Sequence, residues 1–329
     1  MVSRSVAPVT SADVAAVHPR VAAHVRRTPV LRLDAVEFGL DVGDASPPLV
    51  AKLDLLQPTG SFKVRGAVAL LTDPSLSDRL REAGVIAASG GNFGLAVAWA
   101  ATRLGITATV VVPASSPPAK LDPIAALGAQ LVLVDGVYGD AFVEAERRRA
   151  VDGAVLAHAY DQPQVVAGQG TSARELLASV DGLDTLLVAC GGGGLLAGTI
   201  AAVGHRVRVV AVETRGTTTL HAALAAGRPV DVEVSGEAAS SLGARRIGAH
   251  AWAVRDRLAG TVLVDDAEVA TAQQRLWQAA RLVAEPGGAV ALAALTSHRY
   301  RPEAGERVGV LLCGANTDPS SILPTSPHR

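Results

Sequence analysis

The chain has few cysteines and few aromatic side chains, and its positive and negative charges nearly balance. Two cysteines among 329 residues cannot form the disulfide framework of a secreted scaffold, so we expect a reducing compartment. The formal net charge is −1, and no basic stripe indicates nucleic acid as a partner. The apolar runs are strand-sized and interrupted, which excludes a membrane span, and residues 1–20 lack the apolar core of a targeting signal. These absences predict a soluble, cytoplasmic protein.

Hydrophobic residues, in contrast, make up 49% of the chain, which suits a large core and excludes a disordered protein. Short β-branched runs alternate with stretches of helical spacing such as Gly94–Leu104 and Gly139–Ala150. This order is typical of parallel sheets covered by helices, and it predicts an α/β fold. The predicted strands are Leu49–Leu55, Val85–Ala88, Thr107–Val112, Gln130–Val134, Ala154–His158, Thr185–Ala189, Val207–Val212, Thr261–Val264 and Arg307–Leu312. The predicted helix caps are Thr10 or Ser11 for the first helix and Asp265 or Asp266 for Ala267–Leu282.

A run of four glycines, Gly191–Gly194, lies between a predicted strand and the predicted helix Leu195–Val203. Glycines let the backbone approach an anion closely, and the helix start supplies free N–H groups, so the run predicts a phosphate site. A tight turn without a ligand is the plainer interpretation. Gly192, Gly194 and Ala197 also fit a dinucleotide fingerprint, with Glu213 at the end of the next strand, so a nicotinamide-dependent dehydrogenase is a further alternative.

Lys63 stands at the start of a predicted helix, after a strand and a Pro-Thr-Gly turn, with Ser61 as a candidate cap. The positive end of the helix dipole disfavours an ammonium group and shifts the lysine towards its neutral, nucleophilic form. A neutral amine is what Schiff-base chemistry requires. The alternative is an ordinary surface lysine at a helix start.

The segment Gln57–Ala67 resembles the cofactor-lysine segment of the threonine/serine dehydratases, which are fold-type II pyridoxal-phosphate enzymes. The resemblance continues, in the family's order, through most of the chain. The further matching segments are Arg27–Leu31, Ser89–Asn92, Ala167–Thr171 with Glu175, Gly191–Leu195, Glu285–Ala289 and Cys313–Asn316.

The resemblance implies a two-lobed fold like that of the tryptophan synthase β chain. Residues 1–80 and 162–329 would form the large cofactor-binding domain, and residues 81–161 a small mobile domain that carries the substrate loop. Members of the family are commonly dimers, so a homodimer is expected.

Roles for individual residues follow from the same resemblance. Lys63 would bind pyridoxal 5'-phosphate as a Schiff base, with Phe62 beside the ring and Asn92 hydrogen-bonded to the ring hydroxyl oxygen. Cys313 would face the pyridine nitrogen. The phosphate would be held by Gly191, Gly192, Gly193 and Gly194. The substrate carboxylate would be held by Ser89, Gly91 and Asn92.

The implied activity is that of a dehydratase, or ammonia-lyase, which converts a β-hydroxy amino acid such as L-threonine or L-serine to a 2-oxo acid and ammonia. Lys63 would act as the general base. A thiol at Cys313 cannot keep the ring nitrogen protonated as a carboxylate would, which favours elimination over transamination. Another elimination, a replacement or a racemisation on the same scaffold stays open, as does a binding protein without catalysis.

Four departures from the family pattern bear on the substrate. Phe93 replaces a histidine, which allows a larger or more apolar β-substituent than a methyl group. Gly90 stands where related serine racemases have a second serine as base, and Val64 where replacement enzymes have aspartate, so both alternatives lose support. Ser240 and Ser241 stand within a segment where many relatives have Ala-Asp-Gly.

A cation site is the last feature that the resemblance suggests. Glu213, the Thr217 carbonyl and Thr219 match its positions. Thr219 supplies only a neutral oxygen, which suits a monovalent cation or none, since divalent ions prefer more carboxylates. The alternative is that Glu213 caps the following helix.

Overall fold

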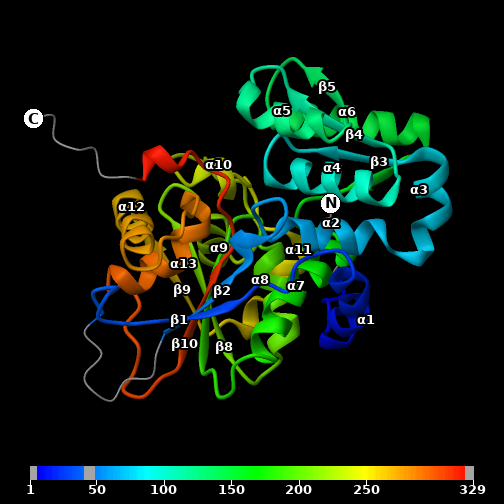
Figure 1. Ribbon diagram of the computed structural model, residues 1–329. Coiled ribbons are helices and arrows are strands. Elements are labelled where there is room, and N and C mark those ends of the chain that lie inside the picture. Colours follow the sequence, from blue (N-terminus) through cyan, green and yellow to red (C-terminus); the bar gives the residue numbers. More distant parts are fainter. Residues whose placement is uncertain (1–5, 41–48, 323–329) are drawn as a thin grey trace, which may run out of the picture.

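The computed structural model describes residues 6–40 and 49–322, which form two β-sheets and the helices packed on them (Figure 1). The larger sheet has six strands in the order β1-β2-β10-β7-β8-β9. All neighbours in it are parallel apart from β1, which is antiparallel to β2. The smaller sheet has four parallel strands in the order β5-β4-β3-β6. The predicted α/β fold with parallel sheets is confirmed.

The strands are β1 (Val30–Leu33), β2 (Leu49–Leu53), β3 (Val85–Ala88), β4 (Ala108–Pro113), β5 (Gln130–Val134), β6 (Val155–Ala157), β7 (Thr185–Ala189), β8 (Arg208–Thr214), β9 (Gly260–Val264) and β10 (Val308–Leu312). The helices are α1 (Ser11–Ala22), α2 (Lys63–Leu71), α3 (Ser77–Ala83), α4 (Asn92–Leu104), α5 (Pro118–Ala126), α6 (Tyr138–Asp152), α7 (Pro163–Leu177), α8 (Gly194–Val203), α9 (Thr219–Ala226), α10 (Ala239–Leu242), α11 (Ala249–Ala253), α12 (Asp266–Arg275) and α13 (Pro286–Thr296). Within the described ranges, no helix is long and apolar enough to cross a membrane.

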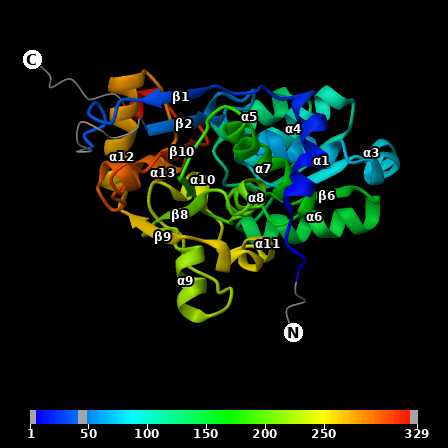
Figure 2. The same cartoon turned by 90° about the horizontal axis from the view of Figure 1, so that it is seen from below.

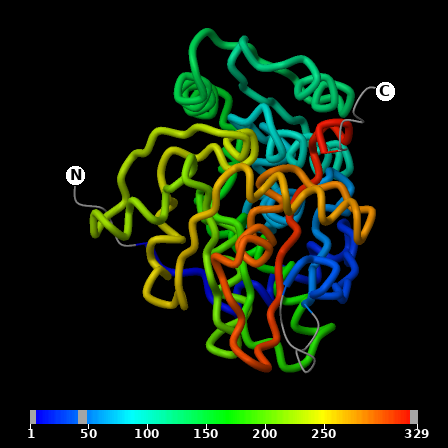
Figure 3. The backbone as a smooth tube through the Cα atoms, turned by 90° about the vertical axis from the view of Figure 1, so that its left-hand side faces the viewer, coloured from blue at the N-terminus to red at the C-terminus, as the bar shows by residue number. Residues whose placement is uncertain are grey.

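The smaller sheet is an insertion between β2 and β7 of the larger one. All of its strands come from the continuous stretch 85–157, and the chain then returns to the larger sheet through α7. Figure 3 shows this stretch, coloured cyan to green, at the top of the molecule. The division into a large and a small domain at residues 81 and 161 stays a prediction.

The sequence predicted most strand boundaries within two residues of those observed. The strands β3, β5 and β7 begin and end as predicted. Thr10 caps α1, because its hydroxyl accepts from the Asp13 N–H (3.3 Å) while its own N–H donates to the Asp13 carboxylate (2.8 Å). These ends could be predicted because local side chains determine them.

Two elements differ from the prediction. The edge strand β1 was not predicted, because its four residues gain their extended form from pairing with β2. The helix predicted to run to Leu282 leaves α-helical geometry after Arg275. It passes through a π-helical turn, Leu276–Ala280, and ends where Arg281 adopts a left-handed conformation with φ of 55°.

Helices α7 and α8 pack backbone against backbone through glycines. A Cβ atom on Gly198 would lie 2.3 Å from the Val166 carbonyl oxygen, and one on Gly170 would lie 2.5 Å from the Gly198 carbonyl oxygen. A Cβ on Gly168 would likewise lie 2.5 Å from the Arg65 carbonyl oxygen of α2. The three helices approach this closely only because these positions lack side chains.

We expect Gly198→Ala to lower the free energy of unfolding by about 1–3 kcal/mol, since the added methyl group has no room. Gly139, in α6, is the matched control, because a Cβ there meets no atom within 4 Å. Gly139→Ala should leave stability unchanged or raise it by up to ~1 kcal/mol. Urea unfolding followed by circular dichroism measures both, and equal stability of the two variants would contradict the proposed packing.

Candidate active site

Segments that follow several parallel strands meet at the carboxyl ends of those strands, where ligands bind in open α/β sheets. The Lys63 segment follows β2, the glycine run follows β7, and Cys313 follows β10, which lies between these two strands. The backbone ties two of these segments together directly. Phe62 N–H donates to the Cys313 carbonyl (2.9 Å), and Ser61 forms a β-bridge with Gly314.

Lys63 is the first residue of α2, and its amine has a single partner among the described residues. Nζ donates to the Ala159 carbonyl oxygen (2.9 Å), which also accepts from Gln169 Nε2 (3.1 Å). Burial lowers the pKa of Lys63 to about 8, although the nearby Cys313 and Glu285 act in the opposite direction. The expected shift towards a neutral amine is confirmed in direction, with burial as its largest cause.

The prediction that Ser61 caps α2 is wrong. The helix begins one residue later than such a cap requires, with Phe62 at the capping position and no side-chain hydrogen bond. The Ser61 hydroxyl is fully buried and has no partner in the described part of the chain. Its backbone is drawn instead into the bridge with Gly314, which determines where α2 starts.

The glycine run forms the start of α8. Gly193 has a φ of 86° and occupies the capping position, and no side chain caps the helix. The carbonyls of the run are held by neighbours: Thr219 Oγ1 donates to the Gly191 oxygen, and Gly248 N–H donates to that of Gly192 (3.0 Å). The N–H groups at the uncapped helix start are therefore the part of the run that suits an anion.

Two side chains, Tyr160 and Gln169, lie so close to this loop that they explain its glycines independently of a ligand. A Cβ on Gly192 would lie 2.3 Å from Cγ of the Tyr160 ring. A Cβ on Gly194 would lie 2.6 Å from Gln169 Oε1, a buried oxygen without a protein partner in the described ranges. The uncapped helix start, the buried Lys63 amine with its lowered pKa, and the Ser61 and Gln169 oxygens that lack a partner among the described residues fit a polar phosphorylated ligand.

Asn92 begins α4 directly after Gly91, at the end of the loop that follows β3. Its Nδ2 donates to Glu285 Oε1 (2.6 Å), and its Oδ1 accepts from Asn316 Nδ2 (2.8 Å). Ser89 and Gly91 lie half-buried at the same helix start, where uncapped N–H groups suit a carboxylate. The structure therefore brings Asn92 to the larger sheet, next to Glu285.

Cys313 is buried, and its Sγ lies 3.5 Å from the Gly287 carbonyl oxygen. Burial, with a contribution from Glu285, raises the pKa of the thiol far above its usual value, so the side chain stays neutral. Burial also raises the pKa of Glu285 to about 7. If the ring nitrogen of the expected cofactor is unprotonated, the group that faces it must be neutral. The Cys313 thiol meets this requirement.

The segment that contains Ser240 and Ser241 contacts the start of α13. Ser241 Oγ accepts from the Gly287 N–H (3.0 Å), which satisfies one of the free donors at the start of that helix. Ser240 is exposed and bonds only its own turn, through the Glu237 carbonyl (3.1 Å). Phe93 is buried in the hydrophobic core.

Glu213 caps α9, the helix beyond the β9 edge of the larger sheet (Figure 2). Its two carboxylate oxygens accept from the N–H groups of Leu220 (2.7 Å) and His221 (2.8 Å). Burial raises the pKa of Glu213 to about 7. Thr219 Oγ1 lies 3.1 Å from the same carboxylate, and the Thr217 hydroxyl pairs with Thr214 (2.9 Å). The capping interpretation therefore accounts for the carboxylate, and a cation beside it stays a prediction.

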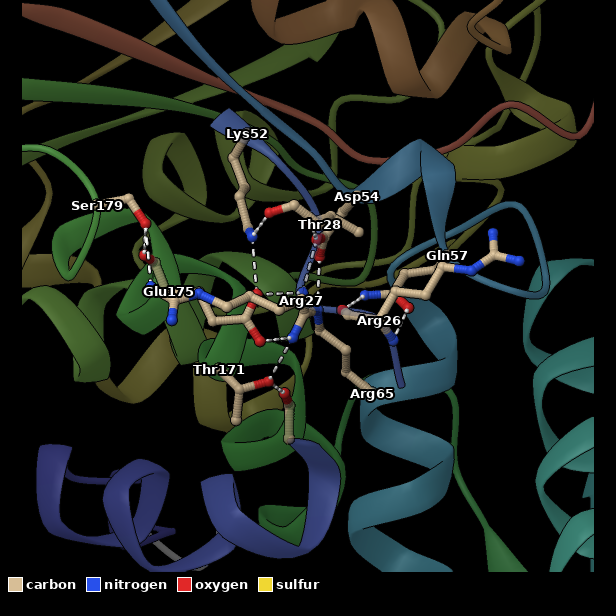
Figure 4. A network of polar contacts seen from close by, with 11 residues as sticks. Arg26, Arg27, Thr28, Lys52, Asp54, Gln57, Arg65, Thr171, Glu175 and Ser179 are labelled. Carbon is tan, nitrogen blue, oxygen red and sulfur yellow. Dashed lines mark hydrogen bonds and ion pairs between the residues drawn. The ribbon is translucent and has the colours of Figure 1, made fainter. Parts of the chain in front are cut away.

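A buried ion network around Arg65, two residues after Lys63 in the chain, was not predicted (Figure 4). Arg65 donates to both Asp54 oxygens (2.8 and 2.9 Å) and to both Glu175 oxygens (2.8 Å each), and Lys52 donates to Glu175 (2.7 Å). No member is more than 4% exposed. Two cations and two carboxylates make the cluster neutral, and it joins β2, α2 and α7.

Two threonines complete this network. Thr28 Oγ1 donates to Asp54 (2.7 Å), and Arg65 also donates to Thr171 Oγ1 (3.2 Å). Burial raises the pKa of Asp54, but the charge and hydrogen bonds of Arg65 outweigh this and hold it below its usual value. The sequence carried one signal for the cluster, since Lys52 and Asp54 interrupt an otherwise apolar strand.

Comparison with known proteins agrees with this geometry. Residues 21–314 match the family model described as "Pyridoxal-phosphate dependent enzyme". The chain belongs to this family of pyridoxal-phosphate-dependent enzymes, which removes the support for the dinucleotide alternative.

The chain is 35% identical to the L-threonine ammonia-lyase of Geobacter sulfurreducens, over 92% of its own length and 74% of that protein. It is 36% identical to the phenylserine dehydratase of Ralstonia pickettii, over 94% of each. Among solved structures, maize serine racemase is similar with a TM-score of 0.87 and 28% identity, over 96% of each chain. Several other curated relatives are longer, and the chain spans 51–56% of their length.

We expect the reactivity of Lys63 towards acetic anhydride to rise with pH through a midpoint of about 8, because its pKa is lowered to that value. Above this pH the amine is neutral and nucleophilic; below it the amine is protonated and unreactive. The chain has three lysines, so peptide mass spectrometry separates Lys63 from the exposed Lys120 and the ion-paired Lys52. Modification of Lys63 only near pH 10 would contradict the prediction.

We expect Arg65→Met to lower the free energy of unfolding by about 3–5 kcal/mol, because it leaves buried carboxylates short of a partner. Arg246→Met is the matched control, since it removes an exposed arginine from its pair with Asp231 (2.7 Å). That variant should keep the wild-type midpoint of urea unfolding. Similar midpoints for both variants would mean that the buried network does not stabilise the fold.

Proposed function

We propose that the protein is a pyridoxal-phosphate-dependent ammonia-lyase that removes water and ammonia from a small β-hydroxy amino acid, with L-threonine and L-serine as first candidates. The observation that carries the proposal is the buried amine of Lys63, whose pKa is lowered to about 8, beside the uncapped start of α8. The names of the threonine ammonia-lyase and phenylserine dehydratase relatives support the reaction class.

The proposed cofactor roles follow the residues at the site. Lys63 would hold the cofactor covalently, with Phe62 against the ring. Gly191, Gly192, Gly193 and Gly194 would bind the phosphate through backbone N–H groups. Asn92 would donate to the ring oxygen, and Cys313 would face the ring nitrogen as a neutral thiol. When bound, the cofactor supplies an electron sink for charge that develops on the substrate α-carbon.

The remaining steps would be carried out by residues of the chain. The start of α4, with Ser89, Gly91 and Asn92, would bind the substrate carboxylate. The amine of Lys63, once displaced by the substrate amine, would take the α-proton. The β-hydroxyl would leave as water, and hydrolysis of the resulting enamine would consume one water and release the 2-oxo acid and ammonia.

Racemisation and replacement on the same scaffold would each use a residue that this chain does not have at the matching position. A second base opposite Lys63 is missing at Gly90, where a Cβ would meet Val112 at 3.3 Å and Ser116 at 3.5 Å. Val64 is fully buried among apolar residues and offers no polar group. These two positions favour elimination over racemisation and replacement.

Several finer features stay part of the proposal. Residues 81–161 would move as a small domain and close on the substrate, because the carboxylate-binding loop belongs to it. A monovalent cation near Glu213, Thr217 and Thr219 would share a carboxylate that already accepts two backbone N–H groups. Assembly as a homodimer and a location in the cytoplasm are further predictions.

We expect the cofactor-loaded protein to form a 2-oxo acid and ammonia from L-threonine or L-serine, and Lys63→Ala to lower the rate by roughly 10²–10⁴-fold or more, because the general base is lost. Quantification of the 2-oxo acid as its hydrazone measures the rate. Lys120→Ala, an exposed lysine, is the control and should keep the wild-type rate. Absence of a 2-oxo acid from every β-hydroxy amino acid tried would overturn the proposal.

A second candidate substrate class is a β-hydroxy amino acid with an aromatic β-substituent. It is favoured by the similarity to phenylserine dehydratase over 94% of both chains. Parallel assays of L-threonine, L-serine and β-phenylserine decide between the classes, because the substrate with the highest kcat/KM identifies the β-substituent that the site accepts.

A further inference from the structure

The hydrogen bonds around Asn92 fix which way its side-chain amide points. The Thr59 carbonyl can only accept, so the Asn316 amide must turn its nitrogen towards it (2.9 Å). The same nitrogen then donates to Asn92 Oδ1 (2.8 Å), which leaves Nδ2 of Asn92 facing the Glu285 carboxylate (2.6 Å). The Thr59 carbonyl cannot donate, so neither amide can be reversed without breaking a bond.

Glycines make room for both partners of Asn92. A Cβ on Gly314 would lie 1.9 Å from Glu285 Oε1, and one on Gly60 would lie 2.1 Å from Asn316 Oδ1. The Glu285 backbone is fixed as well, since its N–H donates to the Gly314 carbonyl (3.0 Å). The two side chains that hold Asn92 are therefore themselves held in place.

The fixed orientation leaves one Nδ2 hydrogen of Asn92 without an acceptor in the described part of the chain. Through this hydrogen Asn92 offers a ligand a donor. Such a donor stabilises an ionised ring oxygen of the cofactor more than a protonated hydroxyl, because a hydrogen bond to a charged oxygen is the stronger one. Asn92 belongs to the inserted smaller-sheet stretch, whereas Glu285 precedes α13 and Asn316 follows β10 of the larger sheet, so the bonds also connect the inserted stretch to the larger sheet.

We propose that Glu285 is a positioning residue that, with Asn316, locks the Asn92 amide as a hydrogen-bond donor towards the cofactor ring. The proposal rests on the proposed function, because it assumes that pyridoxal phosphate binds at Lys63. Glu285 acts through Asn92 and takes no part in proton transfer from the substrate.

The test compares variants by the dissociation constant of pyridoxal phosphate and by the absorption spectrum of the bound cofactor, which separates ionised from neutral ring oxygen. We expect Glu285→Ala to weaken binding roughly ten-fold, as loss of a charge-assisted hydrogen bond predicts, and to shift the spectrum towards the neutral form. Glu285→Gln keeps an acceptor oxygen and should restore most of the wild-type behaviour. Asn316→Ala, an exposed position where folding is not at risk, should change the spectrum in the same direction.

Glu306→Gln is the matched control, because Glu306 is a buried glutamate whose partners, Arg208 (2.9 Å) and Tyr300 (2.6 Å), lie outside the site. It should bind the cofactor as the wild type does. Wild-type binding and spectrum in Glu285→Ala and Asn316→Ala would overturn the inference, as would Glu285→Gln being as impaired as Glu285→Ala, which would indicate a role for charge alone. Failure of the wild-type protein to bind pyridoxal phosphate through Lys63 would overturn the proposed function itself.

Discussion

The ion network of Arg65, Asp54, Glu175 and Lys52 fixes the frame on which the site is built (Figure 4). It joins β2 to α2 and α7, while the bridge between Ser61 and Gly314 holds the start of α2. Buried charges carry a large desolvation penalty, which only complete pairing offsets. The two cations and two carboxylates therefore tolerate few other arrangements of these three elements.

Lys63, in the same stretch of chain, is a second buried basic side chain, and burial affects its charge differently from that of Arg65. Arg65 stays charged because two carboxylates surround its guanidinium group. Lys63, two residues earlier, has the Ala159 carbonyl as its one hydrogen-bond partner in the described part of the chain, and burial lowers its pKa to about 8. One short helix thus presents a permanent structural charge at Arg65 and, at Lys63, an amine that loses its proton at a pH near 8. The difference lies in the partners supplied by β2, α7 and the loop after β6.

Much of the fold followed from local patterns, since apolar strands, glycine turns and helix caps are determined by neighbouring residues. The glycine run, Lys63 and Asn92 were recognised because their segments resemble a known family. Ser61 was misjudged because a distant partner, Gly314, fixes its backbone. Glu285 was placed in a family segment without a role, because its contact with Asn92 joins positions 193 residues apart.

The amino-acid sequence by itself determined the parallel α/β architecture, the family and Lys63 as the candidate cofactor lysine, because these depend on periodicity and on short motifs. Only the tertiary structure decided which groups surround that lysine. Burial lowers the pKa of Lys63, carboxylates from β2's flank and α7 enclose Arg65, and Glu285 with Asn316 orients Asn92. Such effects depend on distances between segments far apart in the chain, and those distances exist only once the two sheets have packed together.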